Sequence, residues 1–104
     1  MSLLVYITVP DGEIAETLAR GLVEAGLAAG VNVAGPVFSV YRWQGEIHEA
    51  REWQLFCQSD RTAFNELREF VLRNHPHSVP CIMGMETEVG NPAFINWISR
   101  HSRK

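Results

Sequence analysis

Three residues that are close in the sequence carry side chains well suited to bind a metal ion. They are His75, His77 and Cys81, a local cluster of two imidazoles and one thiol. Imidazole nitrogen and thiolate sulfur are ligands that copper and zinc accept, and three protein ligands leave one coordination position open. The sequence therefore predicts a copper or zinc site at residues 75–81. In the alternative interpretation, Cys81 only begins a buried strand, since free cysteines are often part of the core.

The other histidines and the second cysteine are weaker candidates. His48 lies between Glu46 and Glu49, whose carboxylates could support a surface cation, but a solvated turn explains the same residues better. We expect His101 to lie in a frayed terminal tail. Cys57 alternates with large apolar residues, which predicts a position in the core or in an interface.

No set of residues typical of an enzyme is present in the sequence. Covalent or acid–base catalysis needs a nucleophile paired with a base, or two carboxylates in different environments. An acylphosphatase is the nearest enzymatic alternative, but it needs an arginine after the first strand, where this chain has the acidic loop Pro10-Asp11-Gly12-Glu13. The glycines also lack the spacing of a phosphate-binding loop. We therefore predict a protein that is not an enzyme.

The length, the charge and the N-terminal residues of the chain exclude several classes of protein. A chain of 104 residues is predicted to form one domain, residues 1–104. Nine Lys and Arg against twelve Asp and Glu, with a basic run only at residues 100–104, argue against nucleic-acid binding. The apolar run at residues 3–7 is too short to span a membrane and lacks the flanks of a secretory signal. We expect a cytoplasmic protein with both cysteines reduced.

The elements that must position these residues follow from hydrophobic periodicity and from turn and cap signals. They are a strand at 2–9 that we expect to be buried on both faces, a helix at 11–25, a hairpin at 32–58, a helix from about 59 to 73, a strand at 79–86 and a helix from 91. This βαββαβ order predicts an α+β sandwich of the ferredoxin-like type, with two helices on one face of an antiparallel sheet and an additional C-terminal helix.

The hairpin between the second and third strands is too long for such a small domain to cover. A two-residue turn at Gln44-Gly45 would pair Trp43 with Glu46 and give Gly45 a positive φ. The second arm, residues 46–58, would then be roughly 43 Å long at about 3.3 Å per residue. Exposed strand edges aggregate unless another chain covers them. We therefore expect β-strand pairing between subunits, and the alternative is a twisted arm wrapped over its own domain.

Five segments together carry a resemblance to a known family. They are residues 27–33, residues 39–47 with Tyr41-Arg42-Trp43-Gln44-Gly45-Glu46, residues 64–67, Asn74-His75-Pro76 with Val79-Pro80, and residues 90–98. In these segments the chain resembles the CutA family of divalent-cation tolerance proteins. The resemblance implies a ferredoxin-like subunit related in shape to the PII signalling proteins, a homotrimer, and a role in the response to copper and other divalent cations. It implies no settled enzymatic activity.

The chain departs from the usual pattern of that family at five positions, which we expect to surround one cleft. Ile7 replaces a cysteine of some members, Asn74 replaces one of two paired histidines, and Gln58 replaces a frequent lysine. His77 and Cys81 stand where the family usually has tyrosine and glutamate. Two alternatives to a metal-binding trimer therefore stay open: a PII-like signalling trimer with a small ligand between its subunits, and a trimeric scaffold without its own metal site.

Overall fold

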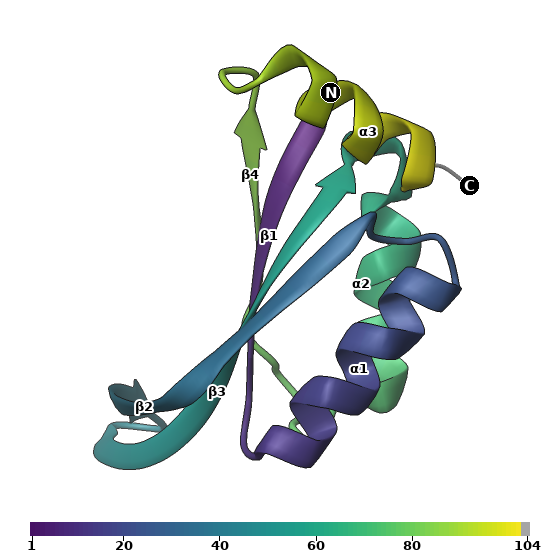
Figure 1. The fold of residues 1–104 in the computed structure, drawn as a ribbon. Coiled ribbons are helices and arrows are strands. Elements are labelled where there is room, and N and C mark those ends of the chain that lie inside the picture. Colours follow the sequence, from purple (N-terminus) through teal and green to yellow (C-terminus); the bar gives the residue numbers. More distant parts are fainter. Residues whose placement is uncertain (103–104) are drawn as a thin grey trace.

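The chain folds in the predicted order of strands and helices, and the computed structural model describes residues 1–102 (Figure 1). The elements are β1 (Ser2–Val9), α1 (Gly12–Glu24), β2 (Gly30–Trp43), β3 (Glu46–Asp60), a 3-10 turn (Arg61–Ala63), α2 (Phe64–Asn74), β4 (Ile82–Thr87) and α3 (Pro92–His101). The strands form one antiparallel sheet in the order β2-β3-β1-β4. The predicted ferredoxin-like α+β fold is confirmed.

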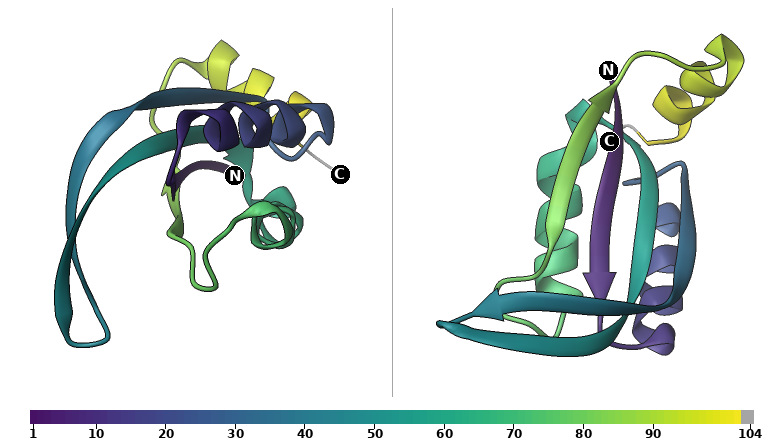
Figure 2. Two further views of the ribbon diagram at one scale, coloured as in Figure 1. Left: turned by 90° about the horizontal axis from the view of Figure 1, so that it is seen from below. Right: turned by 90° about the vertical axis from the view of Figure 1, so that its left-hand side faces the viewer.

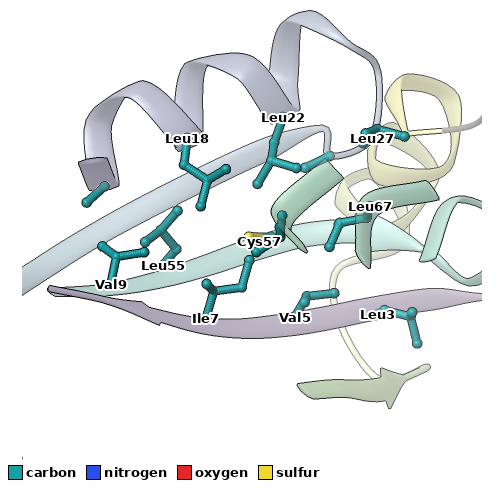
Figure 3. Packing of buried hydrophobic residues seen from close by; sticks show 13 residues of the cluster. Leu3, Val5, Ile7, Val9, Leu18, Leu22, Leu27, Leu55, Cys57 and Leu67 are labelled. Atoms are coloured by element: carbon teal, nitrogen blue, oxygen red, sulfur yellow. The ribbon is translucent and has the colours of Figure 1, made fainter. Parts of the chain in front are cut away.

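The core lies between one face of the sheet and the two helices α1 and α2 (Figure 3). Its buried side chains come from alternate positions of β1, from the inner faces of both helices and from β3; they include Leu3, Val5, Ile7, Val9, Leu18, Leu22, Leu55, Cys57, Leu67 and Val71. The intervening residues Leu4, Tyr6 and Thr8 are only half-buried. The expectation that β1 is buried on both faces is therefore wrong, because α1 and α2 pack on the same side and leave the other face of the sheet open.

Polar side chains begin α1 and α3, and a glycine follows the end of α1, as the sequence predicts. The Asp11 carboxylate accepts a hydrogen bond from the Ile14 N–H at 2.8 Å, and Gly26 follows α1 with a φ of 72°. The Asn91 side chain accepts one from the Ala93 N–H at 3.1 Å at the start of α3. The second helix differs from the prediction, because β3 extends to Asp60 and a 3-10 turn precedes α2.

The buried carboxylate of Asp60 joins three parts of the chain. One oxygen, Oδ1, lies 3.3 Å from the amino group of Met1 and accepts a hydrogen bond from the Ser99 hydroxyl at 3.2 Å. The other, Oδ2, accepts bonds from the backbone N–H and the hydroxyl of Thr62 at 3.0 and 2.7 Å. Asp60 therefore fixes the start of β1 and the inner side of α3 to the end of β3.

Acid should weaken the fold through Asp60. Burial raises the pKa of this carboxyl, but the hydrogen bonds from Thr62 and the charge of the amino group of Met1 outweigh it and lower the pKa to about 2. A carboxyl whose pKa is lower in the folded state stabilises the fold above its unfolded pKa, and this stabilisation disappears as the pH falls toward 2. We expect a loss of about 2 kcal/mol in the free energy of unfolding between about pH 4 and pH 2.

Urea unfolding over a pH series measures this loss of stability. The Asp60→Asn variant should show a flatter profile in this range, and equal slopes for both proteins would contradict the prediction.

The hairpin of β2 and β3 has the predicted register. Trp43 pairs with Glu46, and the turn residues Gln44 and Gly45 have positive φ values of 50° and 80°. The register shifts between Ala34 and Val37, which is the bulge expected around Gly35-Pro36. The hairpin is longer than predicted, since β2 begins at residue 30 and β3 contains 15 residues.

The outer part of this hairpin, residues 37–52, is called the hairpin arm below. β1 pairs with β3 only over residues 53–60, so residues 46–52 pair with β2 alone. The arm projects from the body of the subunit instead of lying over it (Figure 2). Phe38, Val40 and Ile47 are more than half exposed on the arm. The arm thus exposes apolar side chains that its own domain does not cover.

The C-terminal helix is longer than the sequence suggests. His101 lies within α3, and its ring centroid is 5.7 Å from that of Trp97, so the expectation of a frayed tail at this residue is wrong. The last two residues of the basic run, Arg103 and Lys104, lie outside the described residues. Within residues 1–102, every helix is too short or too polar to cross a membrane.

Candidate metal site

The predicted metal ligands lie on the loop between α2 and β4, at residues 75–81. The helix ends at Asn74 because Pro76 forces His75 out of the α region, and His75 has φ and ψ of −104° and 138°. The next strand begins at Ile82, so the predicted start at Val79 is wrong. Pro80 has no N–H to donate to a strand ladder, which explains the late start.

Both ring nitrogens of His75 are engaged within the chain. Nε2 lies 2.7 Å from the carbonyl oxygen of Thr8, and because a carbonyl only accepts, this nitrogen donates. The Nδ1 atom of His75 accepts a hydrogen bond from the backbone N–H of His77 at 3.0 Å. His75 is also buried. It joins the loop to the end of β1, and a metal ion could bind this ring only if one of the two bonds broke.

The His77 ring is more open to a ligand. Its centroid lies 5.0 Å from that of His75, the residue is exposed, and within residues 1–102 neither of its ring nitrogens makes a hydrogen bond. Cys81 is a free, partly exposed thiol just before β4, so it does not begin the strand as the alternative interpretation assumed. However, in the part of the chain that the structure describes, no three His, Cys, Asp or Glu residues form a group that could hold a metal ion. One folded chain therefore offers His77 and Cys81 as separate donors, not a complete three-ligand site.

The second cysteine is a core residue, in agreement with its alternation in the sequence. Cys57 is fully buried in the core beneath α1 (Figure 3). Burial raises the pKa of this thiol to about 12. Because the thiolate is the form that binds metal, Cys57 is not a ligand at neutral pH.

The other candidates and the altered family positions do not gather in one place. His48 stacks against Tyr41 on the hairpin arm, with ring centroids 5.5 Å apart. Ile7 is buried in the core, whereas Gln58 lies on the opposite face of the sheet and donates to the Asn32 side chain at 2.9 Å. Within one chain these positions do not surround a common cleft, because alternate residues of a strand point to opposite faces.

Two exposed thioether side chains follow Cys81 on the next strand. Met83 and Met85 lie two and four residues after it, and both are at least half exposed on β4.

Comparisons with known proteins give a consistent result. Residues 3–101 match the family model described as CutA1 divalent ion tolerance protein. The divalent-cation tolerance protein CutA of Thermus thermophilus is 40% identical over 98% of this chain and 99% of its own length. A solved structure of a Thermus thermophilus divalent cation tolerance protein, Cut A1, has a TM-score of 0.96 at 40% identity and covers 98% of this chain and 99% of its own.

Two further relatives show how far the similarity extends. The structure described as the periplasmic divalent cation tolerance protein CutA from Archaeoglobus fulgidus has a TM-score of 0.93 at 35% identity, with 99% of this chain and 100% of that chain covered. A CutA homolog from Xenopus laevis is 37% identical over 89% of this chain, which spans 62% of that longer protein. The similarity thus extends over nearly all of this chain.

Proposed function

The chain belongs to the family of CutA1 divalent ion tolerance proteins, and on this premise we propose that it binds copper or zinc as a homotrimer that acts in metal-ion tolerance. The observation that carries the proposal is the exposed imidazole of His77, whose ring nitrogens make no hydrogen bond within residues 1–102. Of the three predicted ligands, His77 and Cys81 supply the open donors. His75 holds the His77 backbone in place, because its Nδ1 atom accepts a hydrogen bond from the His77 N–H. The proposal includes a cytoplasmic location and no enzymatic activity.

Features at the edge of the sheet support the assembly. β2 is an edge strand of 14 residues, and one side of its backbone has no strand partner in the chain that the structure describes. Its outer part carries exposed apolar side chains on the hairpin arm, where a second copy could cover them. Since one chain lacks a complete three-donor group within residues 1–102, we place the missing donors at a seam between subunits.

A second candidate function is favoured by the same lack of a complete group. A PII-like signalling trimer would hold a small anion or metabolite in a cleft between subunits, and a trimeric scaffold would need no ligand. Neither requires His77 and Cys81 to share a cation. The metal proposal predicts that substitution of His77 or Cys81 lowers cation affinity. A PII-like trimer or a scaffold predicts no such change.

Calorimetric titration of the reduced protein with Cu(II) and Zn(II), with mass measured by light scattering, tests the proposal. We expect micromolar or tighter binding that His77→Ala and Cys81→Ser each abolish at this concentration. His75→Gln should weaken it about 10- to 100-fold, as is typical when an orienting partner is lost. His101→Ala, at an exposed residue of α3, is the matched control and should bind like the original chain. Millimolar binding that none of the loop variants changes would refute the metal proposal and favour the second candidate.

A further inference from the structure

The hairpin arm leaves the body of the subunit at Trp53. Going outward along β3, this residue is the last one that pairs with β1, where its partner is Val9. Beyond it, the two strands of the arm pair only with each other in the part of the chain that the structure describes. A two-stranded ribbon twists and bends easily, because no third strand holds it. The direction of the arm therefore depends on what fixes its base.

The indole ring of Trp53 fills the space between two glycines at this base. A Cβ atom on Gly12, the first residue of α1, would lie 3.1 Å from the indole Nε1 atom. A Cβ atom on Gly35, in the bulge of β2, would lie 2.8 Å from the ring atom Cδ1 and 3.0 Å from the Trp53 Cα. Any larger residue at either position would crowd the ring. The indole is thus held between the start of α1 and the second strand.

The hairpin also bends at this place. Its register shifts between Ala34 and Val37, so Trp53 lies opposite the bulge at Gly35-Pro36 instead of one paired residue. A bulge bends the strand that contains it and increases the local twist. Trp53 packs against the hydrophobic core as well. The bend of β2, the start of α1 and the core therefore meet at one side chain of β3.

We propose that Trp53 fixes the angle between the hairpin arm and the body of the subunit, and that this angle decides how many copies close into one assembly. Copies that join head to tail form a closed ring only if each contact rotates the next copy by the right amount, and otherwise they form open chains. A rigid base keeps this rotation the same in every copy. The inference rests on the proposed trimer, but Trp53 positions the arm and need not contact a second copy.

The distance between two spin labels tests the position of the arm directly. The labels are attached at Glu46→Cys on the arm and Glu16→Cys on α1, both at exposed residues, in a Cys81→Ser background. Cys57 is buried and should stay unlabelled. Labelled chains are diluted with unlabelled ones, so that only distances within one chain are recorded. We expect one narrow distance, which Trp53→Val should lose, because valine suits a strand but leaves the space between the glycines empty.

A second variant and a matched control separate this role from a general loss of stability. Gly12→Leu keeps the indole but displaces it from between the glycines, so it should also lose the narrow distance. Phe70→Val is the control, because the Phe70 ring packs on Gly21, where a Cβ atom would lie 2.8 Å from it, and joins α1 to α2 away from the arm. This variant should unfold at lower urea and keep the narrow distance. Circular dichroism shows whether each variant is folded.

Light scattering of the same samples measures the number of copies. The original chain and Phe70→Val should each give one mass, whereas Trp53→Val and Gly12→Leu should give several. An original chain that is a single subunit with a narrow distance would refute the trimer and support the fixed angle. A lost narrow distance with one unchanged mass would overturn the link to assembly. A narrow distance that both folded variants retain, or a broad one in the original chain, would overturn the role of Trp53.

Discussion

Replacing Leu67 by alanine should lower the free energy of unfolding by about 2–5 kcal/mol. Leu67 is fully buried and projects from α2 into the core beside Cys57 (Figure 3). The truncation removes apolar contacts and leaves a cavity that α2 and the sheet can close only in part, so both terms destabilise the fold. Urea unfolding followed by circular dichroism measures the change.

The same helix supplies a matched control for this prediction. Leu72 lies on α2 but is 41% exposed, so Leu72→Ala should change the free energy of unfolding by only about 0.5–1 kcal/mol. Both variants lose the same atoms and have the same helix propensity. Equal destabilisation by the two would show that α2 does not pack on the sheet as described.

Introducing two carboxylates on the hairpin arm should dissociate the proposed trimer. The measured mass should then fall to that of one chain, about a third of the trimer. The double variant Val40→Glu, Ile47→Glu changes side chains that are 57% and 66% exposed in the single chain. The subunit should therefore still fold. A seam that covers the arm would have to bury the new charges, and one of them would lie opposite Glu49.

Light scattering of the purified variant measures this loss, and thermal unfolding checks the fold. Val23→Glu is the matched control, because Val23 is 43% exposed but lies on α1, away from the arm. Its mass should equal that of the original chain. An arm variant of unchanged mass, or an original chain that is already a single subunit at low concentration, would refute the proposed trimer.

Much of the fold was predictable because local signals decide it. The Gln44-Gly45 turn fixes the register of the hairpin, and Asp11 and Asn91 fix the starts of two helices. The burial of β1 was predicted wrongly because an apolar run does not show how many faces the helices cover. The exposure of Leu4 depends on which face of the sheet α1 and α2 cover. The sequence does not show this, because it does not place residues that are far apart in the chain.

The candidate site was less predictable than the fold. Sequence identifies imidazoles and thiols, but it does not show whether their atoms are already engaged. The Nε2 atom of His75 bonds to Thr8, 67 residues away, and this contact exists only after the sheet has formed.

The division of β3 has a consequence for how such a chain changes over generations. Its residues 54–58 pair with both β1 and β2, whereas residues 46–52 pair with β2 alone. If the proposed trimer forms through the hairpin arm, inherited changes in the outer half should alter how copies pair while each subunit keeps its own fold. Changes in the inner half should be removed by selection, because they would destabilise the fold of each subunit. We therefore expect two rates of divergence along one strand, with the boundary near Trp53.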